Sequence, residues 1–160
     1  ENSKPAMDVG SASALNLVLN SALALGDFSI FFVTDFNAAS GAILGTDVSG
    51  GDYIRARTTN TMRIKEGGTE KTFRNIDISN QGVFSVFRNG TAGNVFVDGA
   101  GSTNNPLTLP SGDLDLTQIA DANGVAHHAG TIQEIIIYPS DQSTNRVGIE
   151  TNINDHYGIY

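Results

Sequence analysis

The 160-residue sequence contains no cysteine and no tryptophan. Without cysteine the chain has neither disulfides nor thiolate metal sites, and cysteine usage gives no indication of the redox compartment. Platforms that bind neutral sugars tightly usually offer a large aromatic face, and the chain has only four tyrosines. These absences exclude a disulfide scaffold and weaken the case for tight binding of neutral sugars.

Positive charge is also scarce. Nine lysines and arginines stand against 17 aspartates and glutamates, which gives a net charge of −8. Proteins that bind duplex nucleic acid or an anionic membrane surface normally carry the opposite sign, because contacts with phosphate supply much of their affinity. No apolar run approaches the ~20 residues that a bilayer-spanning helix needs. We therefore expect no nucleic-acid partner and no membrane insertion.

The first ten residues, ENSKPAMDVG, lack the basic and apolar segments of a signal peptide. They also lack an initiator methionine, so we expect a processed product or a domain taken from a longer chain. Residues 1–12 are small and polar and are expected to form an N-terminal arm or linker. The length of the remainder predicts a single domain over residues 13–160.

Short segments with the patterns of β-strands follow one another at intervals of about 8–12 residues. Residues 27–36 are apolar on both faces, which predicts a strand at the centre of a sheet covered on both sides. Residues 52–65 alternate as a hairpin, and Asn89-Gly90 predicts the tight turn of a second hairpin over residues 83–98. This pattern indicates a sandwich or a barrel. Further strands are predicted at residues 13–19, 41–45, 71–78, 113–119 and 131–138.

The C-terminal segment changes from strand to helix periodicity. Ile149, Ile153 and Tyr157 recur every four residues, which places them on one face of a helix. Ser140 or Asp141 is expected to cap the first turn, because a side-chain oxygen there satisfies orphan backbone N–H groups. The sequence thus predicts a chain of strands that ends in one helix packed against its own sheet.

The order of these segments resembles a concanavalin A-like lectin/glucanase domain of the LamG-like type. The resemblance rests on DFSIFFVTDF, GAILG, YIRARTTNTMRI, VFSVFRNG, NVFVDGA and the closing HHAGTIQEIIIYPSDQSTNRVGIETNINDHYGIY, and it covers about residues 13–160. It implies an all-β fold: an antiparallel two-sheet jelly-roll sandwich with one short C-terminal α-helix. Its closing segment is similar to those of bacteriophage tail, fibre and head-surface proteins and of large secreted bacterial proteins.

The resemblance implies a non-catalytic phage virion or surface structural module with an attachment or decoration role. The alternative is a carbohydrate-binding, lectin-like module of a secreted bacterial protein. Glucanases of this fold carry paired carboxylates on one strand; the nearest run here, residues 113–115, contains no glutamate, so we expect no enzyme. The expected partners are other virion or surface proteins, including copies of the chain itself, and a host-surface glycan. The expected location is the virion or the extracellular space.

The first hairpin carries the sharpest local feature. Six of the nine basic residues lie between Arg55 and Arg74. Because guanidinium groups match carboxylate and sulfate oxygens in pairs, this face suits an anionic glycan or an acidic partner. A solvated sheet face with cross-strand pairs, or a subunit contact, explains the same pattern. The residues expected on the outward face are Tyr53, whose ring can stack on a sugar, and Arg55, Arg57, Arg63 and Lys65.

Two loops add candidate ligand-binding residues. Asn104 and Asn105 lie in the longest loop, where their amides suit sugar hydroxyls and plain turns alike. His127 precedes the last strand together with His128, and we interpret this pair as a feature of the rim. A metal site needs further ligands at set spacing, and the third histidine, His156, lies in the predicted helix.

Three loop aspartates and one strand glutamate are further candidate functional residues. We expect no cofactor, but the resemblance leaves calcium possible at the rim of the sandwich, at Asp47, Asp98 or Asp121, and nothing in the sequence selects one of them. Glu134 lies in a mostly apolar strand. It could face a groove, but we favour an ion pair with Arg146 or Arg88.

Overall fold

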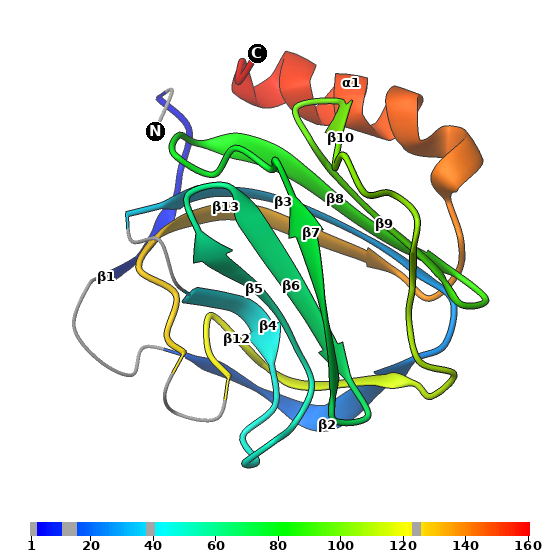
Figure 1. Cartoon of the computed structure of the whole chain (residues 1–160). Helices are drawn as coiled ribbons and strands as arrows, with labels where there is room; N and C mark the ends of the chain where they lie inside the picture. Colours follow the sequence, from blue (N-terminus) through cyan, green and yellow to red (C-terminus); the bar gives the residue numbers. More distant parts are fainter. Residues whose placement is uncertain (1–2, 11–15, 38–40, 123–125) are drawn as a thin grey trace.

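The computed structural model describes residues 3–10, 16–37, 41–122 and 126–160. Two antiparallel sheets pack face to face (Figure 1). The larger sheet has seven strands in the order β1-β13-β3-β8-β9-β10, with β11 also paired to β9. The smaller sheet has six strands in the order β2-β12-β4-β5-β6-β7. The predicted antiparallel two-sheet jelly roll is confirmed.

Most strands lie where the sequence predicts them. The strands of the larger sheet are β1 (Met7–Gly10), β3 (Phe28–Phe36), β8 (Gly82–Asn89), β9 (Ala92–Val97), β10 (Ala100–Gly101), β11 (Leu107–Thr108) and β13 (Gly130–Tyr138). Those of the smaller sheet are β2 (Leu17–Leu25), β4 (Gly41–Gly45), β5 (Tyr53–Thr58), β6 (Thr61–Glu66), β7 (Thr69–Arg74) and β12 (Leu114–Ile119). The chain ends in a 3₁₀ turn, η1 (Ser143–Asn145), and in α1 (Arg146–Tyr157).

Three boundaries differ from the sequence prediction. Residues 7–10 of the expected arm form β1 and pair with β13. The predicted strand at residues 13–19 begins partly outside the described residues, and β2 continues to Leu25 along β12. The predicted strand at residues 71–78 ends at Arg74, although Ile76 and Ile78 remain buried and donate backbone hydrogen bonds to the residues 59–60 turn.

The main core lies between the two sheets. β3 sits between β13 and β8, and its side chains are buried on both faces, as predicted. Phe32 points into the sandwich and stacks on Phe84 with ring centroids 5.1 Å apart. Phe31, its neighbour, belongs to a second cluster on the other side of the sheet and meets Phe87 edge to face. A second layer must therefore cover the outer face of the seven-stranded sheet.

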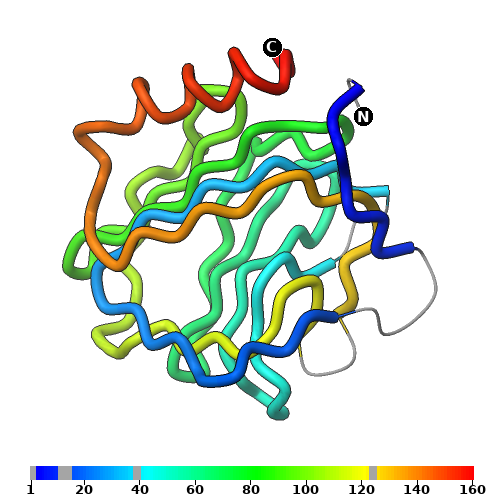
Figure 2. Tube along the Cα trace, turned by 180° about the vertical axis from the view of Figure 1, so that it is seen from behind, coloured from blue at the N-terminus to red at the C-terminus, as the bar shows by residue number. Residues whose placement is uncertain are grey.

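That layer is α1, which crosses β8 (Figures 1 and 2). Ile149, Ile153 and Tyr157 pack against the outer cluster, as the four-residue spacing predicts. The predicted cap by Ser140 or Asp141 is wrong, because neither η1 nor α1 has a side-chain cap hydrogen bond. The Asp141 carboxylate instead accepts a local hydrogen bond from the Ser143 amide (2.9 Å). Among the described residues no helix is long and apolar enough to cross a membrane.

Candidate binding face on the six-stranded sheet

The outer face of β5, β6 and β7 carries the basic hairpin, on the side of the sandwich away from α1 (Figure 1). Strand alternation sends the apolar side chains of β5 and β6 inward, where they are buried. The outward side chains form two directly opposed pairs, Tyr53 with Lys65 and Arg55 with Arg63. We call these four residues, together with Glu70 of β7, the basic face.

Glu70 holds the centre of the basic face. Its carboxylate lies 2.6 Å from Arg63 Nη1, and it also accepts a hydrogen bond from the Tyr53 hydroxyl. In the register, Glu70 stands directly opposite Lys65. Like charges opposed across two strands destabilise a sheet, so this carboxylate offsets the repulsion between Arg55 and Arg63. Sequence analysis missed Glu70, although the same alternation that places Lys65 outward also places Glu70 outward.

Tyr53 is flanked by cations. The Arg55 guanidinium carbon lies 4.9 Å from the centroid of the Tyr53 ring, and Lys65 Nζ lies 5.8 Å from it. Both separations suit cation–π attraction. Burial raises the pKa of Tyr53 to about 12, and the hydrogen bond to Glu70 adds to this effect. The hydroxyl therefore stays protonated at neutral pH and remains a hydrogen-bond donor.

Two opposing effects act on the pKa of Glu70. Its partial burial favours the neutral form, but the hydrogen bond from Tyr53 and the charge of Arg63 outweigh that effect and lower its pKa below the usual range. One carboxylate thus remains among three cations at neutral pH. The basic face keeps an excess of positive charge in a chain whose net charge is −8.

A small cavity of about 80 Å³ adjoins the basic face. Its walls are Tyr53, Arg55, Lys65, two glycines of the loop before β5, and the alanines Ala122 and Ala126. Among the described residues, Arg55 Nε and Arg63 Nε are buried donors without a hydrogen-bond partner. The arrangement therefore combines unused guanidinium N–H groups, an aromatic ring and a small apolar wall.

The other predicted binding residues lie apart or are used internally. Arg57 is exposed at the end of β5, where the register with β6 is irregular. The Asn104 amide accepts from Arg74 N and donates to Thr72 O, each at 3.0 Å. The Asn105 amide forms two bonds to the Val95 backbone. Both asparagines thus tie their loop to the sheets.

The two loop histidines take different environments. His127 is about one-third exposed, and its Nδ1 lies 3.1 Å from the Asp121 carboxylate. His128 is buried, with Nε2 2.9 Å from Thr34 Oγ1 and its ring edge-on to Phe36. Burial lowers the pKa of His128 to about 4, so this side chain is neutral at physiological pH. It anchors the residues that precede β13.

The three aspartates considered for calcium have different partners. Asp98 Oδ1 accepts from Val83 N (2.8 Å), and Asp121 accepts from Ala122 N (2.7 Å) and from an Asn16 amide. In the described part of the chain no group of three or more His, Asp or Glu could hold a metal. Calcium at Asp47, Asp98 or Asp121 stays a prediction.

The expected ion pair of Glu134 with Arg146 or Arg88 is wrong. Arg146 Nη1 lies 2.6 Å from Glu150, four residues along α1, and Arg88 Nη1 lies 2.6 Å from the buried Glu66. Each arginine is therefore committed to a nearer carboxylate. Glu134 instead lines a groove beside α1.

No protein family and no curated protein matches the sequence. Solved structures nevertheless share the architecture. The CBM40 of Ruminococcus gnavus IT-sialidase superposes with a TM-score of 0.64 at 10% identity, over 91% of this chain and 98% of that one. Domains LG4-5 of the mouse laminin alpha1 chain give 0.59 at 14% identity, over 82% of this chain and 40% of that one.

Trypanosoma rangeli sialidase gives a TM-score of 0.57 at 13% identity, over 79% of this chain. The chain spans 23% of the length of that sialidase. At identities of this order the likeness establishes the fold, which is a concanavalin A-like jelly roll. The phage origin and virion role that the closing segment suggests stay predictions.

Proposed function

We propose that the domain is a non-catalytic, lectin-like module that binds an acidic glycan on the basic face. The observation that carries this proposal is the convergence of Arg55 and Lys65 on the Tyr53 ring, with Arg63 directly opposite Arg55 on the next strand. Guanidinium groups bind carboxylates through paired, charge-assisted hydrogen bonds, and a tyrosine ring packs against the apolar face of a sugar.

The fold comparison supports a carboxylate-bearing sugar as the first ligand to test. The Ruminococcus gnavus CBM40 has been solved bound to alpha2,3 sialyllactose. A sialic acid residue carries one carboxylate on a compact ring, and the cavity between Tyr53 and Ala126 adjoins the cations that would hold that carboxylate. An extracellular or cell-surface location accords with such a ligand.

Isothermal titration calorimetry with α2,3-sialyllactose, and with lactose as the uncharged control, tests the proposal. We expect saturable binding of sialyllactose and at least about tenfold weaker binding of lactose, because charged hydrogen bonds contribute roughly 1.5–3 kcal/mol each. The double variant Arg55→Ala plus Arg63→Ala should lose sialyllactose binding. Arg57→Ala, at the exposed end of the same strand, is the matched control and should retain it.

Three results would contradict the proposal. Equal affinity for lactose and sialyllactose would show that the carboxylate is not recognised. Absence of binding to any acidic oligosaccharide of a glycan array would favour the structural interpretation of the basic face. Release of reducing sugar from an array glycan would contradict the non-catalytic assignment.

A further inference from the structure

The last half of β13 is a free sheet edge. β1 pairs only with residues 130–132, whereas β3 pairs with β13 as far as Tyr138. Among the described residues, no strand pairs with residues 134–138 on the side away from β3. Every second residue of such an edge directs its N–H and C=O away from the sheet. The edge therefore offers a row of backbone hydrogen-bonding groups to an added strand.

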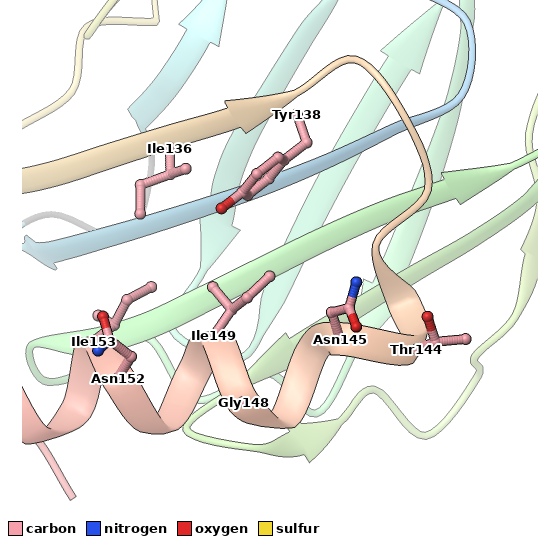
Figure 3. Close-up of a pocket in the computed structure, with 8 residues that line it drawn as sticks. All are labelled: Ile136, Tyr138, Thr144, Asn145, Gly148, Ile149, Asn152 and Ile153. Carbon is pink, nitrogen blue, oxygen red and sulfur yellow. The ribbon is translucent and has the colours of Figure 1, made fainter.

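A groove follows this edge on the α1 side. Ile136 and Tyr138 project from β13 toward Ile149 and Ile153 of α1 (Figure 3). A cavity of about 500 Å³ lies around Ile136 and Tyr138, and a second of about 470 Å³ lies around Glu134 and Ile136. The two cavities share Ile136 and Ile153, so they form one continuous groove along β13 and α1.

The step from one cavity to the next along β13 matches the two-residue repeat of side chains on one face of a strand. Side chains that leave the same face of a strand are two residues apart. The two cavities are centred on successive pairs of such residues, Glu134–Ile136 and Ile136–Tyr138. A strand added to this edge would place its own same-face side chains opposite these residues and therefore into the groove.

The two ends of the groove differ in charge. Ile149 and Ile153 give the end near Tyr138 an apolar floor. Glu134, Asp155 and His156 line the other end, beside the last turn of α1, whose backbone dipole adds negative potential. In the part of the chain that the structure describes, neither Glu134 nor Asp155 has an ion-pair partner. This end of the groove is complementary to a cation.

The inward side of the edge is also incompletely covered. Ile135 and Ile137 pack against the main core but remain half-buried. An added strand would cover them with its alternate side chains. Its sequence should therefore carry apolar or β-branched residues on the core side.

We propose that an extended segment of a partner protein adds to β13 as a further antiparallel strand, with an apolar residue opposite Ile136 and a lysine or arginine opposite Glu134. Addition of a strand to an exposed edge is a common mode of peptide recognition, in which backbone bonds give affinity and side-chain pockets give specificity. The antiparallel direction continues that of β1, which already occupies the first part of the same edge. This surface lies on the opposite sheet from the basic face and does not depend on glycan binding.

The test uses the complete 160-residue chain labelled with ¹⁵N. The probe is a capped peptide, Thr-Val-Val-Thr-Lys, whose central valine would face Ile136 and whose lysine would face Glu134. We expect saturable amide shifts in β13 and α1 and slower hydrogen exchange at residues 134–138. A peptide with glutamate in place of lysine should bind at least about tenfold more weakly, because it opposes like charges across the strands.

Variants make the test specific. Glu134→Lys should reverse the preference, so that the glutamate peptide binds better than the lysine peptide. Asp115→Lys reverses an exposed charge on β12 of the other sheet and should leave both affinities unchanged. Gly148→Leu should weaken binding, because a side chain at this groove-lining position meets no protein atom within 4 Å and would extend into open space. Thr151→Leu, exposed on the same helix, is its control.

The proposal is overturned by any of three results. The first is the absence of amide shifts in β13 at about 1 mM lysine peptide, a concentration that equals the dissociation constant of a very weak complex. The second is a Glu134→Lys variant that keeps the original preference. The third is a set of shifts confined to β5 and β6, which would place the peptide elsewhere.

Discussion

Arg88 of β8 and Glu66 of β6 form a buried ion pair that joins the two sheets. Arg88 Nη1 lies 2.6 Å from Glu66 Oε1, and the two side chains are 5% and 1% exposed. The remaining arginine donors reach the backbone carbonyls of Gly90, Pro110 and Gly112. One side chain thus holds both sheets and a connecting loop together at one end of the sandwich.

Removal of one partner of this pair should be costly. Arg88→Met leaves Glu66 buried without a counter-charge, and such losses cost about 3–5 kcal/mol. We expect a decrease of this size in the free energy of unfolding, measured by urea denaturation. The double variant Arg88→Met plus Glu66→Leu should recover part of the loss, because it removes both charges. A single-variant loss below about 1 kcal/mol, the value typical of surface pairs, would show that the pair is not structurally important.

His128 should make stability depend on pH. Its pKa is about 4 in the folded chain and near 6.5 when unfolded. Because the folded value is lowered, the stabilising contribution is complete above about pH 6.5 and is lost as the pH falls toward 4. The full shift corresponds to roughly 3 kcal/mol. His128→Gln should therefore lose less stability than the unmodified chain between pH 7 and 4, as measured by urea denaturation at each pH; parallel profiles would contradict this.

Glu70 should control the ionisation of Tyr53. Burial and the Glu70 carboxylate together raise the pKa of Tyr53 to about 12. Glu70→Gln removes the negative charge and leaves the positive charges of Arg55 and Arg63, so the pKa of Tyr53 should fall toward 10. NMR titration with ¹³C-labelled tyrosine measures this directly. Asp115→Asn, on the outside of β12 two strands away in the same sheet, is the control and should leave the titration of Tyr53 unchanged.

The guanidinium group of Arg55 should matter beyond its charge. Lysine at this position keeps the charge but loses the planar fork that binds a carboxylate in pairs. Arg55→Lys should weaken binding of α2,3-sialyllactose by about tenfold, the size of one charged hydrogen bond. Calorimetry at low and high salt distinguishes the two contributions. If Arg55→Lys binds as tightly as the unmodified chain, charge alone accounts for recognition.

Docking of α1 should depend on one buried side chain. Ile153 is 3% exposed and packs into the cluster of Phe31 and Phe87. Ile153→Ala should lower the free energy of unfolding by about 2–5 kcal/mol, because it leaves a cavity. Val147→Ala, on the exposed side of the same helix, should change it by less than about 0.5 kcal/mol. Near-UV circular dichroism of the tyrosines would report loss of helix packing.

Periodicity predicted the parts of the fold where one face is buried. Ile54, Met62 and Ile64 alternate strictly, so the hairpin and its outward basic residues were evident from the sequence. β1 was not evident, because Val9 is the one apolar residue of the strand that is buried, and the strand forms by pairing with β13. A short edge strand of this kind has little local signal.

The basic face was only partly predictable. Tyr53, Arg55, Arg63 and Lys65 follow from alternation, but the role of Glu70 depends on the register between β6 and β7. The ion pair expected for Glu134 does not form, because ion pairing depends on distances in the folded chain. Arg146 instead pairs with Glu150 of its own helix. Asn104 looked free in a polar loop, yet its amide bridges Thr72 and Arg74.

Because α1 packs on the outer face of the seven-stranded sheet, the two outer faces of the sandwich differ. The end of α1 and the first described residues lie on the side of the seven-stranded sheet (Figure 2). The Gln133 side chain there donates a hydrogen bond to the Lys4 carbonyl. Any neighbour joined at either end of the chain would attach on the side of α1. The basic face with Arg55 and Arg63 would remain on the opposite side of the domain. If the basic face binds the proposed glycan, several tethered copies would add weak contacts to a dense array of ligands through avidity.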